Sequence, residues 1–389
     1  MQLVYTGEPM PEGFNRSLFL AGPTSRSNEV TSWRPEALRI LEANGYDGVV
    51  FVPEYHEGGP RPDYDSQVGW EHQAINMSDC VMFWVPRDLE KLPAFTTNVE
   101  FGWLVKSGKI VFGAPQNAPN MNYLRRFADK EFVPQSATLD GAVDAALKFL
   151  GEGSYRSGGA RQIPLFIWNT RHFQNWYQAQ YRAGNRLDGA DVKTTFRVGK
   201  RKERLYVWMI HANVFVASEN RNKTNEPVIG RLDISSVVLY RRGKKLLDTE
   251  VVLGREFRSP ASNYECFIWE VPSGSNPDPS VDPLTVAVDE LHEETGFKIE
   301  AARLKPHGAR QLAGTLLTHK SNLYSAELTK EEMNWFRAQS GVPHGADLAT
   351  NPSGERVYTE VVAVREILGK KLVDWSNVGM IFQVLQGVD

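Results

Sequence analysis

The run TTNVEFG at residues 96–102 contains one carboxylate, Glu100, which the surrounding pattern places early in a helix. A carboxylate beneath a sugar stabilises an oxocarbenium-like transition state, or attacks the anomeric carbon to form a glycosyl-enzyme. The dipole at a helix N-terminus favours negative charge, so we expect Glu100 to be ionised. Glu100 is therefore the candidate nucleophile for cleavage of an N-glycosidic bond.

Two further segments carry polar groups suited to the same chemistry. The run AGPTSRS at residues 21–27 is a predicted turn whose glycine lets backbone approach a ligand and whose hydroxyls and arginine donate hydrogen bonds. Asp79 stands at the entrance of an apolar run, and a second acid near the base can protonate the departing nitrogen. The predicted substrate-binding residues are Gly22, Pro23, Ser25, Arg26, Arg87 and Asn98.

Arg26 and Arg87 are candidates for holding a 5′-phosphate, because a guanidinium matches the geometry of phosphate oxygens. The alternative for each is an ordinary surface arginine.

These residues are separated by alternating apolar runs and helical patterns. The apolar runs are predicted strands, and the segments with helical spacing are predicted helices. The strands lie at 18–22, 49–52, 80–85 and 109–113, and the helices at 33–45, 67–77 and 97–106. The alternation indicates an α/β domain with a doubly wound parallel sheet. Active sites of such sheets lie beyond the carboxyl ends of the strands, where the predicted loops and the helix from Thr97 should converge.

Several motifs follow one another in an order that is specific as a set. They are FLAGP at 19–23, FVPE at 51–54, WE at 70–71, Asp79, FWVPR at 83–87 and TTNVEFG at 96–102. On these motifs, residues of about 17–125 resemble the nucleoside 2-deoxyribosyltransferase family. The resemblance implies that Glu100 is the nucleophile, that Asp79 lies near the substrate, and that Gly22 is the glycine of the first loop.

The sequence departs from the family pattern at two places. Better-studied members have a tyrosine in the first strand, where this sequence has Leu18 and Phe19. They also have an aspartate about six residues before the nucleophile, where this sequence has Pro93 and Ala94. The residue that protonates the leaving nucleobase is therefore not fixed by the sequence, and the candidates are Asp79, Glu71 and Glu54. Transfer to a second base and hydrolysis by water both stay open as well.

The middle of the chain changes character. Residues 151–164 contain four glycines and no apolar periodicity, which predicts a linker between a domain at 1–150 and a domain at 165–389. Residues 166–181 are rich in aromatic side chains and predict a helix packed against a neighbouring domain, with an aromatic platform that stacks on a base as the alternative. From about residue 205 the pattern is rich in strands, with helices predicted at 283–295 and 375–386. This indicates an α+β domain with a mixed sheet.

The helix at 283–295 carries Glu290, Glu293 and Glu294, whose i, i+3, i+4 spacing puts them on one face. Three carboxylates gathered there repel one another unless a cation binds, and Mg²⁺ takes carboxylate and phosphate oxygens together. We therefore predict these glutamates as ligands of Mg²⁺ in phosphoanhydride chemistry.

Gly274 before this helix and Gly296 after it complete a pattern that resembles the Nudix box. The resemblance implies a Nudix-like fold that hydrolyses or binds a nucleoside diphosphate derivative. Asp289 replaces the arginine of the box, and Ser280 or Val281 stands where its first glutamate belongs.

Composition excludes several classes of protein. The formal net charge of −3 provides no basic field for nucleic acid, and no apolar run approaches the roughly 20 residues that span a bilayer. Two cysteines exclude a disulfide framework, and the N-terminus lacks a signal peptide, so we expect a cytoplasmic protein. We expect a small nucleoside or nucleotide as substrate, no cofactor for the N-terminal domain and, from the family resemblance, a homo-oligomer.

Three functions compete. The chain is a bifunctional enzyme, or an N-terminal enzyme regulated by a catalytically dead, nucleotide-binding Nudix domain, or a nucleotide sensor throughout. The intact TTNVEFG run argues against the last.

Overall fold

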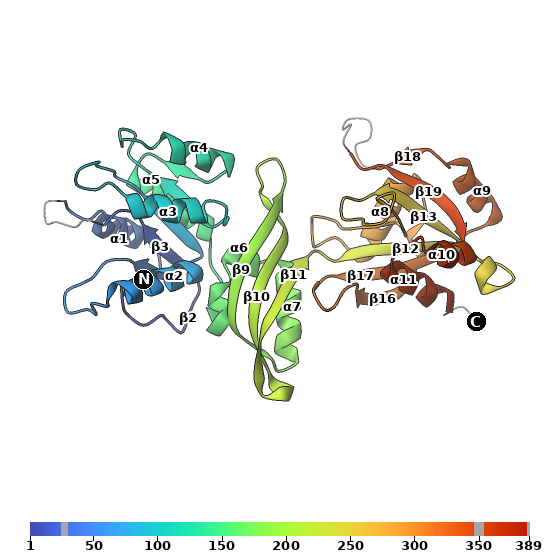
Figure 1. Ribbon diagram of the computed structural model, residues 1–389, viewed down its shortest axis with the longest axis horizontal. Helices are drawn as coiled ribbons and strands as arrows, with labels where there is room; N and C mark the ends of the chain where they lie inside the picture. The colour runs from blue at the N-terminus through green and yellow to red at the C-terminus, as the bar shows by residue number, and fades with distance from the viewer. Residues whose placement is uncertain (25–29, 346–353, 387–389) are drawn as a thin grey trace. The chain divides into compact units, whose positions relative to one another are not determined.

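The computed structural model describes residues 1–24, 30–345 and 354–386 (Figure 1). The chain divides into two compact units, Met1–Gly230 and Arg231–Asp389. The stretch 151–164, predicted as a linker, lies inside the first unit and contains strand β8 (Arg156–Ser157) and the short helix η1 (Gly158–Gln162). It is anchored because the Arg156 side chain is buried. The boundary between units therefore follows Gly230.

A six-stranded sheet forms the centre of the first unit, in the order β1-β4-β3-β5-β6-β7. All its neighbouring strands run parallel, as predicted. The strands are β1 (Gln2–Tyr5), β3 (Ser17–Ala21), β4 (Val49–Val52), β5 (Cys80–Trp84), β6 (Ile110–Gly113) and β7 (Gln135–Ser136). Every residue of β3 to β6 is buried, because helices cover both faces.

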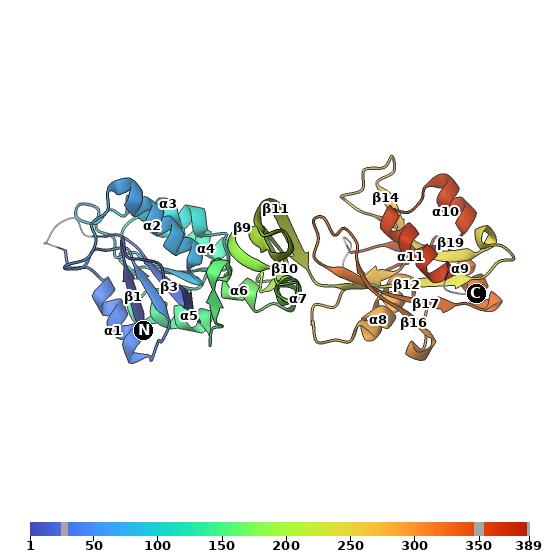
Figure 2. The same cartoon turned by 90° about the horizontal axis from the view of Figure 1, so that it is seen from below.

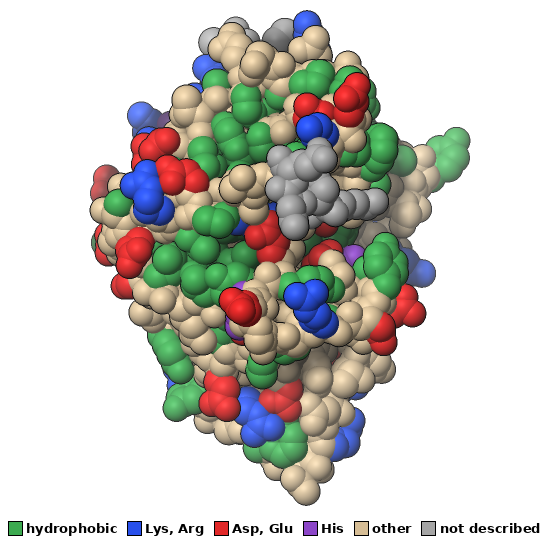
Figure 3. Space-filling model, turned by 90° about the vertical axis from the view of Figure 1, so that its left-hand side faces the viewer, with side chains coloured by type: hydrophobic (Ala, Val, Ile, Leu, Met, Phe, Trp, Pro, Cys, Tyr) green, Lys and Arg blue, Asp and Glu red, His purple; other side chains and the backbone are tan. Residues whose placement is uncertain are grey.

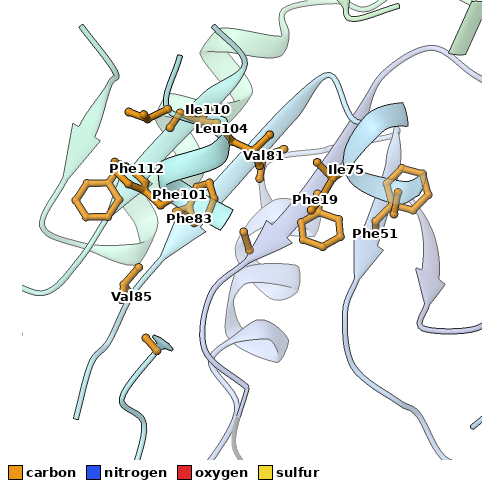
Figure 4. Close-up of a cluster of buried hydrophobic side chains, with 14 of the residues drawn as sticks. Phe19, Phe51, Ile75, Val81, Phe83, Val85, Phe101, Leu104, Ile110 and Phe112 are labelled. Carbon is orange, nitrogen blue, oxygen red and sulfur yellow. The ribbon is translucent and has the colours of Figure 1, made fainter. Parts of the chain in front are cut away.

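The helices of this unit form one layer on each side of the sheet (Figure 2). The layer of α1 (Arg34–Ala43) and α5 (Leu139–Leu150) packs on one face. The layer of α2 (Tyr64–Met77), α3 (Phe95–Leu104) and α4 (Asn122–Lys130) packs on the other. Phenylalanines dominate this second interface (Figure 4), and each contributes about 1.5–3 kcal/mol by its burial.

The remainder of the first unit is a three-stranded sheet, in the order β11-β10-β9. Its strands are β9 (Arg186–Val198), β10 (Arg204–Val216) and β11 (Arg221–Arg231). The predicted aromatic helix is present as α6 (Leu165–Trp168) and α7 (Arg171–Arg182). Phe173 of α7 is fully buried, 5.2 Å from the ring of Trp208, so these aromatic side chains form a core. A small pairing of β2 (Gly13–Phe14) with β8 lies beside it.

The second unit contains an eight-stranded mixed sheet, as the strand-rich pattern predicts. β12 pairs in parallel with β17, and the other pairs are antiparallel. The strands are β12 (Ile234–Arg241), β13 (Glu250–Phe257), β14 (Phe267–Glu270), β15 (Ser273–Gly274), β16 (Lys305–Gln311), β17 (Lys320–Glu327), β18 (Pro343–His344) and β19 (Val357–Ala363).

Helices again cover both faces of this sheet. α8 (Pro283–Thr295) and α9 (Lys330–Ala338) pack on one face, and α10 (Val364–Lys370) and α11 (Trp375–Gln386) pack on the other. The ends of α8 follow sequence signals, because Asp282 caps it through the Leu284 amide and Gly296 ends it with a φ of 70°. Within the described residues, no helix has the length and hydrophobicity needed to cross a membrane.

Candidate active site

In an open parallel sheet, a ligand is expected to bind beyond the carboxyl ends of the strands, at the point where the direction of winding reverses. The connections from β3 lead outward to β4, whereas those from β5 lead to β6, so the direction of winding reverses between β3 and β5. Gly22 follows β3 with a φ of 152°, and a Cβ atom there would lie 2.2 Å from the carbonyl oxygen of Trp84. The loops after β3 and β5 therefore approach so closely that only glycine fits.

Arg34, in the first turn of α1, ties the loops at this edge together. Its buried guanidinium donates to the carbonyl oxygens of Leu20 at 3.0 Å and Gly22 at 2.8 Å. It also forms an ion pair of 2.7 Å with Glu54, which follows β4. Arg34 was not predicted, because nothing in the sequence distinguishes it from a solvated arginine at the start of a helix.

Glu100 is half-buried at the same edge, in the middle of α3. Burial, and secondarily the nearby charge of Glu71, raises the pKa of Glu100 to about 7, although Arg34 acts in the opposite direction. The predicted helix start at Thr97 is wrong, because α3 begins at Phe95 with Ala94 at its N-cap. Glu100 is thus the sixth residue of the helix, beyond the first turn in which the dipole favours negative charge.

Glu71 comes from α2 and is held by a short chain of hydrogen bonds. The amide nitrogen of Gln67 donates to Glu71 Oε1 at 3.0 Å, and the Tyr55 hydroxyl donates to Gln67 Oε1 at 2.8 Å. Glu71 is half-buried and close enough to act electrostatically on Glu100. The space-filling view of this end of the first unit shows acidic side chains beside a broad hydrophobic area (Figure 3).

Comparison with known proteins agrees with this geometry. Residues 15–118 match the model of a family described as "Nucleoside 2-deoxyribosyltransferase like". These residues form a nucleoside 2-deoxyribosyltransferase-like domain. The match includes the loops after β3, β4 and β5 and all of α3.

Other comparisons add little. No curated protein matches the chain. Among solved structures, one described as "Crystal structure of ADP compounds hydrolase" is 15% identical, covering 52% of this chain and 96% of that one with a TM-score of 0.32. Similarity at this level does not define a shared fold.

Asp79 does not belong to the site of the deoxyribosyltransferase-like domain. It precedes β5 and therefore lies at the amino end of the strand, whereas the site lies at the carboxyl ends. Its carboxylate is fully buried, pairs with Arg156 at 2.5 and 2.6 Å, and accepts from the amides of Ser17 and Leu165 at 2.9 Å. The catalytic role predicted for Asp79 is therefore corrected to a structural one.

Arg87 is largely occupied by contacts within the domain. One guanidinium nitrogen donates to the carbonyl oxygen of Asn120 at 3.1 Å, and the other donates to the side-chain oxygen of Asn98 on α3. Burial lowers the pKa of Arg87, and its Nε has no partner among the described residues. Arg87 thus connects α3 to the segment before α4, and its role in binding a ligand stays a prediction.

Of the remaining predicted binding residues, the structure describes Pro23, which follows β3. Pro23 is buried, and its carbonyl oxygen accepts a hydrogen bond of 3.3 Å from the Trp33 indole. Ser25 and Arg26 lie outside the described residues.

The three glutamates of α8 in the second unit do not share one environment. Glu293 is exposed, Glu290 is half-buried, and Glu294 is buried with one oxygen accepting from the Ser273 amide at 3.0 Å. Burial raises the pKa of Glu290 to about 7 and that of Glu294 well above its usual value, and Glu355 contributes to both shifts. Glu355 was not predicted, because it lies far from α8 in sequence.

Arg258 provides the positive charge within this acidic region. Its guanidinium pairs with Glu256 at 2.8 Å, Glu355 at 3.1 Å and Glu270 at 3.2 Å. The carboxylates are of the chemical kind that Mg²⁺ prefers, but within the described residues no three acidic, histidine or cysteine side chains are grouped closely enough to hold a metal. The Mg²⁺ site predicted at Glu290, Glu293 and Glu294 is not assembled among the described residues in this arrangement and stays a prediction.

Proposed function

We propose that the first unit breaks or transfers the N-glycosidic bond of a nucleoside or nucleotide through a covalent intermediate on Glu100. One observation carries the proposal: a half-buried carboxylate lies at the switch point of a parallel sheet, beside an acid and a buried arginine, within a deoxyribosyltransferase-like domain. Buried groups of strongly perturbed pKa at such a position are typical of catalytic residues.

The reaction has two steps. A carboxylate oxygen of Glu100 attacks C1′ of the sugar, the C–N bond breaks, and its electron pair leaves with the base nitrogen. In the second step the nitrogen of another base, or water, attacks C1′, gives up its proton to the Glu71 carboxylate and releases the Glu100 carboxylate. The positive charge of Arg34 favours the ionised, nucleophilic form of Glu100.

Glu71 is the proposed group that relays a proton from solvent to the leaving base. Three acids were candidates for this role. Asp79 is paired with Arg156 at the other end of β5, and Glu54 is paired with Arg34. Within the described residues Glu71 alone among them forms no ion pair, and its charge acts on both Glu100 and Arg34.

Mass spectrometry tests the proposal. The whole protein is mixed with a panel of 2′-deoxynucleosides, ribonucleosides and their 5′-phosphates, quenched and digested. We expect the mass of one sugar on the peptide that contains Glu100, together with free base in solution. If no donor releases base and no adduct forms, the sensor function replaces this proposal.

The pH dependence of base release gives a sharper prediction. Only the ionised form of Glu100 is nucleophilic, and its pKa is about 7. We therefore expect kcat/KM to fall about tenfold per pH unit below that value. Glu71→Gln removes a negative charge that raises the pKa of Glu100, so the acid limb of the profile should move to lower pH.

Two comparisons separate this effect from damage to the fold. Glu71→Gln should lower kcat about 10²–10⁴-fold for ordinary bases but much less for a base that leaves without protonation. Glu42→Gln, an exposed position on α1, should leave both the rate and the profile unchanged. An unmoved acid limb in Glu71→Gln would contradict the assignment.

We also propose that the protein is a homo-oligomer that associates through α3. Phe95, Val99 and Trp103 recur every four residues along one side of this helix and are 75%, 72% and 56% exposed. Exposure of such an apolar stripe to water is energetically unfavourable, and apolar patches of this kind are typical of protein interfaces. Glu100 is next to the stripe in sequence, so a second copy would shield this carboxylate from solvent.

Val99→Asp is expected to shift the protein from oligomer to monomer, because the aspartate would be buried without a partner at the interface. Sedimentation velocity at micromolar concentration measures this change. Leu368→Asp, at an exposed position of the second unit, is the matched control and should leave the mass unchanged. A monomeric wild-type protein would refute the interface.

For the second unit we infer a Nudix-like domain that binds a nucleotide rather than hydrolyses it. Arg258 supports this inference, because it pairs with carboxylates that would otherwise be available to a cation. With Mg²⁺ and a nucleoside diphosphate derivative, we expect no release of phosphate-containing products. Hydrolysis that Glu294→Gln abolishes would favour the bifunctional enzyme instead.

A further inference from the structure

The second unit contains a cavity of about 210 Å³ between β16, β17 and α11. α11 packs on the opposite face of the sheet from α8, so the cavity is separate from the acidic region around Glu294. Sites for drug-sized ligands occupy about 300–1,000 Å³, so this cavity suits one ring system rather than a whole dinucleotide.

The floor of the cavity is defined by its apolar lining residues. Leu312, Leu323 and Met380 contribute hydrophobic surface, and Leu323 is almost fully buried. Ser321 also lines the floor, but its hydroxyl is already bonded to the Ser236 hydroxyl at 2.7 Å. The floor therefore attracts a flat apolar group and offers it few polar contacts.

The rim carries three kinds of unused binding group. Trp375, the first residue of α11, is 88% exposed, which leaves a large aromatic face in water. Arg310 is exposed on β16, and neither it nor Gln383 has a hydrogen-bond or ion-pair partner among the described residues. Gln311 donates to the Leu317 carbonyl at 3.1 Å and keeps its own carbonyl oxygen free to accept.

We propose that this cavity binds the base of a nucleoside monophosphate. The base lies over the apolar floor and stacks against Trp375, the amides of Gln311 and Gln383 bond its polar edge, and the Arg310 guanidinium pairs with the phosphate outside the cavity. An aromatic face, edge-directed amides and an arginine together match this ligand, whereas an aliphatic ligand would leave all three unused.

The proposal deepens the inference that the second unit binds a nucleotide, and it is independent of the chemistry at Glu100. Hydrogen exchange of the full chain locates binding, because nucleotides also enter the first unit. With AMP, GMP, CMP or dTMP at millimolar concentration, we expect protection of peptides from residues 305–311 and 375–386. Equal exchange in these peptides with every nucleotide would overturn the proposal, whether or not the first unit releases base.

Two substitutions test which side chain binds the base and which binds the phosphate. Trp375→Ala should weaken binding at this site about tenfold or more for nucleotides and nucleosides alike, since stacking on an aromatic side chain contributes this much. Arg310→Ala should weaken binding of the monophosphate but leave the nucleoside unaffected. Both residues are exposed, so folding should be preserved, and base release by the first unit should be unchanged.

Tyr264→Ala is the matched control, because Tyr264 is a fully exposed aromatic residue of the same unit away from the cavity. It should leave the protection unchanged. Protection that survives Trp375→Ala, or inorganic phosphate alone giving the same protection as the nucleotide, would contradict a base-binding cavity.

Discussion

Replacement of Glu100 by glutamine is expected to abolish base release and, at the same time, to stabilise the folded protein above neutral pH. The amide cannot attack C1′, so kcat should fall by at least about 10³-fold, as it does when other covalent nucleophiles are removed. Chromatography of the free base measures the loss. Glu100→Asp keeps the carboxylate but shortens it, and should retain a low rate.

The gain in stability follows from the same burial that raises the pKa of Glu100 to about 7 from an ordinary value of 4.5. Between these two pH values the folded state holds the proton more tightly than the unfolded state does. The free energy of unfolding therefore decreases as the pH rises through this window, and the full cost is present above it. Glutamine avoids that cost, about 1–3 kcal/mol after allowance for partial exposure.

Urea unfolding at pH 4.5 and pH 8 separates the two effects. Glu100→Gln should match the wild type at the lower pH and exceed it at the higher one. Glu42→Gln, at an exposed site on α1, should change neither activity nor stability. An active Glu100→Gln variant, or one that is less stable at pH 8, is the result that would remove Glu100 from the mechanism.

The parallel sheet of the first unit was predictable because its strands are buried on both faces. Such strands appear in the sequence as continuous apolar runs, for example residues 80–85. The helices between them show apolar residues at helical intervals. β1 was missed because Gln2–Tyr5 is a short edge strand with one buried residue. Short edge strands carry little periodicity, and only their pairing with β4 identifies them.

The candidate site was predictable at Glu100 and less so around it. Motif and strand direction both place Glu100 at the carboxyl edge, but neither shows that α3 begins at an uncapped Phe95. Glu71 was one of three candidate acids, and only tertiary contacts show that it lies near Glu100. Arg34 also joins the site through tertiary contacts, which leave no local pattern. For Asp79, the direction of β5 already indicated the amino end, although the family resemblance pointed to the substrate.

In the second unit, helical spacing identified α8 but not the surroundings of its glutamates. Positions 290 and 294 lie one turn apart on the same side, whereas Glu293 turns toward solvent. Arg258 and Glu355 reach this region from other parts of the chain. Such long-range contacts determine whether a metal ion or an arginine neutralises the negative charge of the acidic side chains. The spacing of the glutamates alone therefore could not predict the cation.

The ion pair of Asp79 with Arg156 leads to the second large effect. Asp79→Ala is expected to lower the free energy of unfolding by about 3–5 kcal/mol, because it leaves a fully buried guanidinium without its partner. The amides of Ser17 and Leu165 would lose their acceptor as well. Denaturant unfolding followed by circular dichroism measures this loss.

Three comparisons show that the effect is structural rather than catalytic. Asp47→Ala breaks the more exposed ion pair with Arg16 and should cost less than about 1 kcal/mol. The double variant Asp79→Leu with Arg156→Met removes both charges and should recover most of the stability, because neither charge is then left buried alone. Under conditions in which it stays folded, this double variant should release base at close to the wild-type rate, since Asp79 lies at the opposite end of β5 from Glu100. A folded double variant that is inactive would return Asp79 to the catalytic site.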